Sequence, residues 1–202
     1  MPVIYAFPMT VMQRPAAGFM AVREAVFPLL AVATIVASTD IRIPLGLPGH
    51  RGLVWLTLLV AVALVTARRE TVLAVGAASS IATLPMHGWS DPLWSSRYAA
   101  AAALLYAAGS LPAVRVRRWL LSVAAAPIHL VALVSSVFGL HAGGHLSTWA
   151  ANGLLEKAGW HLVFGFLAGL LAWVVALGVG CLPPPNVAGS LLGKNRSEEW
   201  PL

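Results

Sequence analysis

The chain has 202 residues, of which 59% are apolar and only 10% are charged, and its mean hydropathy is +0.82. A soluble domain carries about a quarter charged residues, so this composition excludes an ordinary soluble domain. The net charge of +6 comes from basic residues that punctuate apolar runs, which excludes a nucleic-acid-binding face. Because every backbone polar group must be satisfied within lipid, continuous apolar runs predict an all-α polytopic integral membrane protein.

Six apolar runs predict six short transmembrane helices in one domain over residues 1–182, followed by a polar cytoplasmic tail over residues 183–202. The runs cover residues 19–37, 52–67, 71–84, 98–114, 119–140 and 159–182. Arg23 and Glu24 lie near the start of the first run, where we expect their side chains to reach the lipid headgroups. The second and third runs are short for a full crossing at about 1.5 Å per residue, which predicts a tight helical hairpin.

The connections differ between the two sides of this predicted bundle. Loops 1, 3 and 5, over residues 40–51, 85–97 and 141–158, are long and rich in turn-forming and aromatic residues, whereas the other connections are short and basic. Nine Lys and Arg residues fall on the side of the termini and four on the side of these loops. The positive-inside rule therefore places both termini in the cytoplasm and the three loops at the outer face of a bacterial cytoplasmic membrane.

The outer loops hold the residue types of an amphipathic small-molecule pocket, which needs aromatic walls with a few placed donors and charges. The alternatives are that the tryptophans anchor the chain at the membrane interface and that the loop histidines are solvated. His129 lies inside the fifth run, where an ionisable side chain is costly and is expected to face the bundle interior. The sequence offers it no obvious mate at mid-span.

No motif indicates catalysis, so we predict that the chain is not an enzyme. His141 and His145 have a metal-ligand spacing, but two intervening glycines disfavour the helix that would bring their imidazoles together, and Ala142 stands where a zinc protease needs glutamate. Neither a serine-nucleophile elbow nor a phosphate-binding glycine loop is present. Cys181 has no partner cysteine. We therefore predict no metal site and no disulfide, and the identity of any cofactor stays open.

Small residues recur at every fourth position of the first run. They are Ala17, Ala21 and Ala25, and further along Ala33 and Ala37. Such spacing lets a second helix approach the backbone closely and indicates a docking stripe for a partner subunit. Because alanine is common in this chain, chance spacing and internal packing are the alternatives.

In its layout the chain resembles the substrate-binding S component of energy-coupling factor (ECF) vitamin transporters. The resemblance covers residues 17–182 and rests on the length, six short spans, the alanine stripe, the loop Pro44-Leu-Gly-Leu-Pro-Gly49 and the last helix around Trp160–Leu171. It implies a non-catalytic protein that captures a micronutrient at its outer face and docks on a transmembrane coupling subunit driven by ATPase subunits. No signature of a particular vitamin subfamily is present, and loop 1 is more basic than is usual in that family, which suits an anionic ligand.

The resemblance also implies which residues bind ligand. Together with His129, the candidates are His50, Arg51, His87, Trp89, Asp91, Trp94, His141, His145 and Asn152. Two other classes of function fit the same sequence. One is a haem protein in which two histidines at one depth hold the iron, and the other is an envelope scaffold of the rod-shape-determining type, which needs no pocket.

Overall fold

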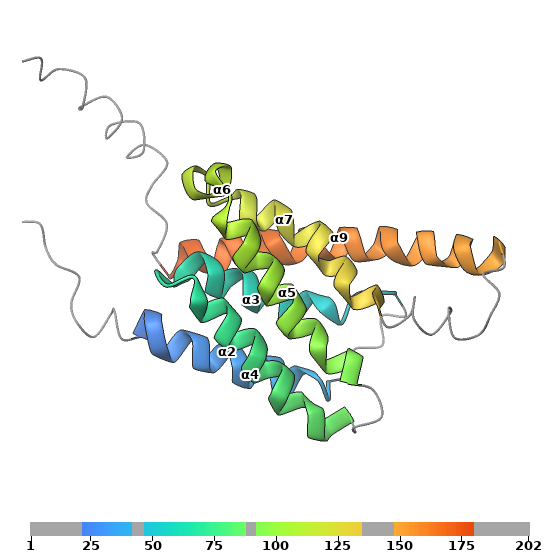
Figure 1. Ribbon diagram of the computed structural model, residues 1–202, viewed down its shortest axis with the longest axis horizontal. Coiled ribbons are helices and arrows are strands. Elements are labelled where there is room, and N and C mark those ends of the chain that lie inside the picture. The colour runs from blue at the N-terminus through green and yellow to red at the C-terminus, as the bar shows by residue number, and fades with distance from the viewer. Residues whose placement is uncertain (1–21, 42–46, 88–91, 135–147, 180–202) are drawn as a thin grey trace, which may run out of the picture.

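A computed structural model of the chain describes residues 22–41, 47–87, 92–134 and 148–179. Over these residues the chain is helical and contains no strand, which confirms the all-α prediction. The elements in chain order are η1 (Val22–Val26), α2 (Phe27–Ser38), α3 (Gly52–Val65), α4 (Glu70–His87), α5 (Pro92–Ser110), α6 (Pro112–Val116), α7 (Leu120–Ile128), η2 (His129–Leu133) and α9 (Thr148–Gly178) (Figure 1).

Each predicted apolar run overlaps a helix, but several boundaries differ from the prediction. Loop 3 is shorter than residues 85–97 because α5 begins at Pro92, whose missing N–H needs no partner at the first helical position. The fourth run is divided because Leu111 precedes Pro112 and is extended there, which ends α5 and starts the short helix α6. Loop 5 is also shorter than residues 141–158, since α9 begins at Thr148.

One segment of the described helices, Gly153–Gly178, is long and apolar enough to cross a bilayer, with a mean hydropathy of 2.1. Three further apolar helices are shorter, at Gly52–Val65, Glu70–Met86 and Leu120–Leu133. The long helix therefore agrees with the sixth predicted span. The number of crossings stays a prediction.

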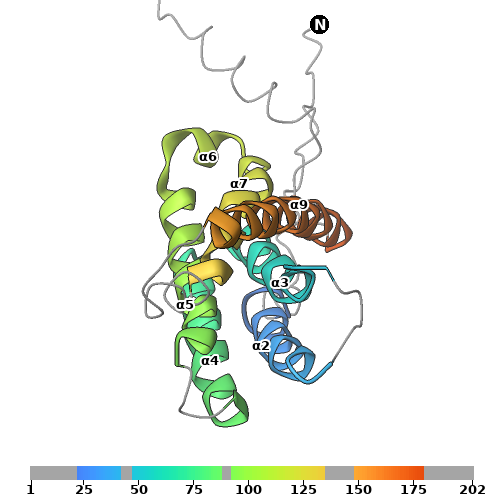
Figure 2. The same ribbon diagram turned by 90° about the vertical axis from the view of Figure 1, so that its right-hand side faces the viewer.

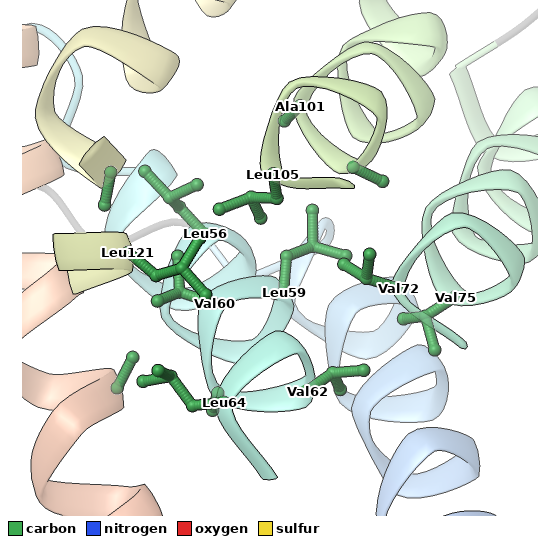
Figure 3. Packing of buried hydrophobic residues seen from close by; sticks show 14 of the residues in the cluster. Leu56, Leu59, Val60, Val62, Leu64, Val72, Val75, Ala101, Leu105 and Leu121 are labelled. Carbon is green, nitrogen blue, oxygen red and sulfur yellow. The ribbon is translucent and has the colours of Figure 1, made fainter. Parts of the chain in front are cut away.

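The helices pack in two layers, with α4, α5 and α7 in one and α2, α3 and α9 in the other (Figure 2). Helix α3 lies at the centre and contacts α2, α4, α5, α7 and α9. A helix that is apolar on all sides suits this position, because every face of it is covered. Its side chains Leu56, Leu59 and Val60 are fully buried and pack with Val72 of α4 and Leu105 of α5 (Figure 3).

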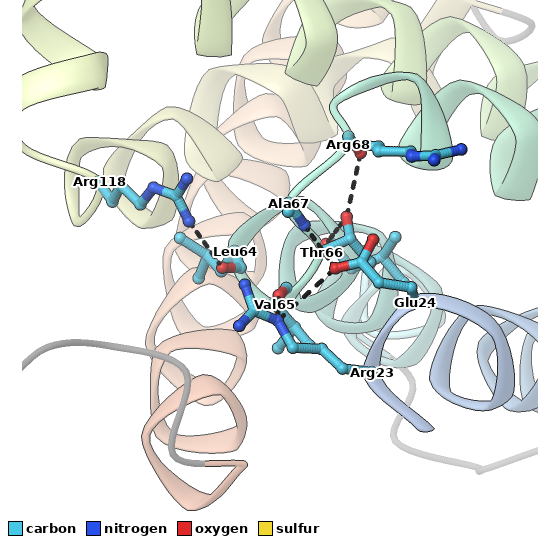
Figure 4. Close-up of polar contacts among 9 residues, drawn as sticks. Arg23, Glu24, Leu64, Val65, Thr66, Ala67, Arg68 and Arg118 are labelled. Carbon is cyan, nitrogen blue, oxygen red and sulfur yellow. Dashed lines mark hydrogen bonds and ion pairs between the residues drawn. The ribbon is translucent and has the colours of Figure 1, made fainter. Parts of the chain in front are cut away.

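Arg23 and Glu24 bind the end of α3. Arg23 Nε donates to the carbonyl oxygen of Val65, and Glu24 Oε1 accepts a 2.8 Å hydrogen bond from the backbone N–H of Ala67 (Figure 4). From the other side, Arg118 Nη1 donates to the carbonyl oxygen of Leu64 over 3.4 Å. The reason is that the last carbonyls of a helix have no intrahelical partner, and α3 ends between other helices, where side chains must supply one.

Helix α9 turns small residues toward the bundle and large apolar residues away from it. The buried positions include Gly165, Ala168, Gly169, Ala172 and Ala176. The outward side chains are 41–63% exposed and comprise Leu162, Val163, Phe166, Leu167, Leu170, Leu171, Val174 and Leu177. A helix surrounded by water would bury the large side chains, whereas a helix surrounded by lipid gains more from close backbone packing.

Candidate functional site

The structure describes the side chains of four predicted ligand-binding residues, namely His50, Arg51, Trp94 and His129. The side chains of the others lie outside the described residues: His87, Trp89, Asp91, His141, His145 and Asn152. The four described residues fall at two neighbouring places. His50 and Arg51 line a cavity, while Trp94 and His129 belong to a buried cluster next to it.

The cavity has a volume of about 170 Å³ and lies between the end of α2 and the start of α3. Besides His50 and Arg51, its lining consists of Thr34, Ala37, Ser38, Ile41 and Val54. The Nδ1 atom of His50 is held by the carbonyl oxygen of Leu47, while its Nε2 atom is buried and has no hydrogen-bond partner among the described residues. Arg51 is exposed at the rim. The cavity thus combines a cation and a half-buried imidazole ring with an otherwise mostly apolar wall.

The turn from Gly49 to Gly52 connects this cavity to two buried histidines. Gly49 has a φ angle of 85°, in the left-handed region that glycine adopts readily, and a Cβ atom there would lie 3.2 Å from Cγ of His161. A Cβ atom on Gly52 would overlap Nε2 of His129. The backbone N–H of Gly52 donates to the carbonyl oxygen of Gly49 over 2.8 Å and closes the turn. This turn therefore carries His50 and Arg51, which line the cavity, and its two glycines pack against His129 and His161.

His129 has a mate, which corrects the expectation that it stands alone. His129 from η2 and His161 from α9 are both buried, their ring centroids are 4.6 Å apart, and His129 Nδ1 donates to the carbonyl oxygen of His161 over 2.8 Å. The pairing depends on a close crossing of α7 and α9, because Cβ atoms on Gly165 and Gly169 would run into the backbone of α7. The Gly165-xxx-Gly169 spacing was the signal in the sequence that could have revealed it.

An arginine and three aromatic rings extend the histidine pair into one cluster. The Arg97 guanidinium lies 3.7 Å from the ring centroid of Trp94 and 4.9 Å from that of Tyr98, and Arg97 Nη2 donates to the Tyr98 hydroxyl over 2.9 Å. Trp55 packs edge-on against Tyr98 and His129, with ring centroids 5.5 and 5.7 Å apart. We call these six residues the aromatic–histidine cluster: Trp55, Trp94, Arg97, Tyr98, His129 and His161.

Sequence reasoning found only Trp94 and His129 of this cluster. Arg97 is the last residue of the predicted loop 3, whereas in the structure it lies in the first turns of α5 and stacks on aromatic rings. Trp55 and Tyr98 sit inside or next to apolar runs, so nothing in their local sequence distinguishes them from core residues. Arginine stacked on aromatic faces in a buried setting gains cation–π energy of about 1–2 kcal/mol, and here both rings belong to α5 itself. The edge-on contact of Tyr98 with Trp55 joins the start of α5 to α3.

The geometry of the histidine pair does not fit iron held between two imidazoles. The Nδ1 atom of His129 is occupied by the carbonyl oxygen of His161, and its Nε2 atom abuts Gly52, so neither nitrogen faces an open position. Within the described ranges no three His, Cys, Asp or Glu side chains are grouped for a metal ion. The pair is arranged for packing and hydrogen bonding.

The predicted docking stripe lies partly within the structure. Ala25, Ala33 and Ala37 are exposed, whereas Ala17 and Ala21 fall outside the described residues. Helix α2 turns Pro28, Ala31 and Ile35 toward the bundle. Internal packing therefore does not explain the alanine spacing in α2, and Ala37 belongs to both the stripe and the cavity lining.

The cavity and the aromatic–histidine cluster meet at one end of the bundle, where α3 and α5 begin. The exposed guanidinium of Arg51, at the rim of a mostly apolar lining, suits a small amphipathic anion. No family model, curated protein or solved structure matches the chain.

Proposed function

We propose that the chain is a multi-pass protein of the bacterial cytoplasmic membrane that captures a small anionic micronutrient at its outer face, as the binding component of an importer. The observation that carries this proposal is the cavity of about 170 Å³ lined by His50 and Arg51. The proposal includes six membrane crossings and two cytoplasmic termini. It also includes a transmembrane coupling subunit with ATPase subunits, as the resemblance to ECF S components implies.

The distribution of side chains supports a membrane location. Outward positions of α9 carry large apolar side chains, and α2 exposes Leu29 at 70% and Leu30 at 59%. The interior instead accepts hydroxyl side chains such as Ser79, Thr83 and Ser122, which are buried. Lipid around the bundle removes the cost of exposing the large apolar side chains. Of the buried hydroxyls, Thr83 donates to the carbonyl oxygen of Ser79 over 2.8 Å.

The distribution of charge supports the orientation. Arg23, Arg69, Arg115 and Arg118 gather where α3 ends and α4 and α7 begin, which is the end opposite the cavity. Cytoplasmic ends of membrane helices are rich in Lys and Arg. The cavity accordingly belongs at the outer end, where a nutrient arrives.

The cavity chemistry supports an anionic ligand with an apolar body. A guanidinium forms two parallel hydrogen bonds with a carboxylate, and Arg51 is exposed at the rim with its fork available to such a group. His50 adds an imidazole to the lining, and its Nδ1 atom donates to the carbonyl oxygen of Leu47. Ile41 and Val54 provide the apolar wall.

The position of Ala37 supports a coupling between capture and docking. It lines the cavity from α2 and also belongs to the exposed alanine stripe, so a partner helix packed on the stripe would lie next to the bound ligand. A change in occupancy of the cavity would then alter the surface that the partner contacts.

Native mass spectrometry of the gently solubilised full chain, with an absorption spectrum of the same sample, tests the proposal. We expect a stoichiometric small organic mass and no Soret band. The Arg51→Gln and His50→Ala variants should lose that mass, while Arg68→Gln, which changes an exposed arginine remote from the cavity, should retain it. A haem mass with a Soret band, or a chain that carries only lipid in every preparation, would overturn the proposal.

A further inference from the structure

We infer that a second pocket, at the end of the bundle opposite the cavity, binds a phosphate group through three arginines. This arginine pocket has a volume of about 160 Å³ and lies where α3 and α5 end and α7 begins. Its polar lining residues are Thr66, Arg69, Tyr106, Arg115 and Arg118. The phosphate group could belong to a lipid headgroup or to a soluble anion. Only the choice between these two sources depends on the proposed membrane location.

Within the described part of the chain, no acidic group compensates the charge of the arginine pocket. Among the residues that the structure describes, no carboxylate lines the pocket, and no ion pair engages Arg69, Arg115 or Arg118. Arg118 makes one long hydrogen bond, at 3.4 Å to the carbonyl oxygen of Leu64, and the Arg69 and Arg115 side chains make none within the same residues. Like charges around one pocket repel each other unless an anion is bound between them. Guanidinium groups match the tetrahedral oxygens of phosphate bidentately.

The surface beside the pocket has the character of a membrane interface. Leu111 is 54% exposed, Val116 80% and Trp119 46%, and they alternate along the chain with Arg115 and the other arginines of the α5–α7 connection. Large apolar side chains interleaved with arginines suit the depth at which acyl chains give way to phosphates. Basic pockets between helix ends on the cytoplasmic side bind anionic headgroups in the same way.

The test uses the full chain in a neutral detergent and two matched double variants. Arg69→Gln with Arg115→Gln removes two charges from the pocket. Arg68→Gln with Arg117→Gln removes two charges from exposed positions near those residues in the sequence but outside the pocket lining, so the two double variants have the same net charge. Lipid binding is measured by native mass spectrometry with phosphatidylglycerol and with phosphatidylcholine, and soluble anion binding by the shift in thermal unfolding with inorganic phosphate against chloride at equal ionic strength.

A lipid source would be established if the chain retains phosphatidylglycerol in preference to phosphatidylcholine. This retention should fall at least tenfold in the pocket variant and stay unchanged in the control. Stabilisation by inorganic phosphate with the same dependence on the variants, and without lipid preference, would establish a soluble source. No preference together with no phosphate effect, or equal loss in both double variants, would overturn the inference. The phosphate measurement needs no bilayer and no outer ligand, so its result is independent of the outer-face proposal, which the Arg51→Gln variant tests separately.

Discussion

At the scale of single residues, the tightest packing in the candidate site is between Gly52 and His129. Gly52 is the first residue of α3, and the His129 ring occupies the space where a Cβ atom on residue 52 would be. We expect Gly52→Ala to lower the free energy of unfolding by about 1–3 kcal/mol, because the ring or the helix must move. Thermal unfolding in one detergent measures the change. Gly109→Ala is the matched control, since nothing lies within 4 Å of its Cβ position.

A double variant separates this overlap from other effects of alanine. His129→Ala removes the obstructing ring, so Gly52→Ala should cost much less in that background, with a coupling energy of about 1–3 kcal/mol between the two positions. Additive losses in the double variant would show that Gly52 acts through the turn rather than through His129. A Gly52→Ala variant as stable as Gly109→Ala would contradict the packing itself.

Residue type alone was enough to single out His129, because an ionisable side chain within an apolar run must find a partner in the interior. It was not enough to find that partner. His161 is 32 positions away, and the contact exists because Gly165 and Gly169 bring α9 against the backbone of α7. Neither Trp55 nor Tyr98 differs in local sequence from a core residue, so their part in the cluster follows from tertiary packing only.

At the scale of elements, the end of α3 is fixed by side chains from a distant helix. Glu24 accepts from the backbone N–H of Ala67 and also lies 3.7 Å from Arg23, which donates to Val65. Glu24→Ala should cost about 1–3 kcal/mol, because it leaves the N–H without its acceptor and Arg23 without its counterion. Hydrogen exchange of peptides over residues 60–70 should accelerate in this variant. Glu156→Ala, at an exposed position of α9, is the control, and equal exchange in the two variants would contradict the role of Glu24.

The crossing of α7 and α9 depends on Gly169 in a similar way. A Cβ atom there would overlap the carbonyl oxygen of Ser122, and a backbone atom cannot rotate away as a side chain can. We therefore expect Gly169→Ala to lower the melting temperature clearly, by the equivalent of about 1–3 kcal/mol. Gly178→Ala, which meets nothing within 4 Å, should leave it unchanged. Similar melting temperatures for the two variants would show that the helices do not approach as closely as described.

The existence of the longer helices could be predicted from the sequence, since each overlaps a continuous apolar run. The residues at which the helices begin and end could not be predicted in the same way. Turn-forming and aromatic residues suggested that loop 5 extends to residue 158, yet α9 begins at Thr148 because no proline interrupts this stretch. Conversely, Pro112 divided a run that hydropathy treats as continuous.

At the scale of the whole molecule, the two ends of the bundle differ in chemistry. One end holds the cavity and the aromatic–histidine cluster, and the other holds the arginine pocket and the arginines that bind the end of α3. Such a polarity is what a fixed orientation in a membrane requires, because arginines resist transfer to the outer side. The charge count behind the predicted orientation and the arginine pocket rest on the same residues, Arg69, Arg115 and Arg118, so the orientation itself stays a prediction.

Cysteine accessibility tests the crossings and the orientation together. In a Cys181→Ser background, single cysteines replace the exposed residues Asp40, Arg68 and Arg117. We expect a membrane-impermeant maleimide to label Asp40→Cys in intact cells, because residue 40 follows α2 at the proposed outer end. Arg68→Cys and Arg117→Cys should react only after permeabilisation, because charge places their connections in the cytoplasm. Labelling of all three in intact cells would contradict six crossings, and the inverse pattern would reverse the orientation and with it the side on which ligand is captured.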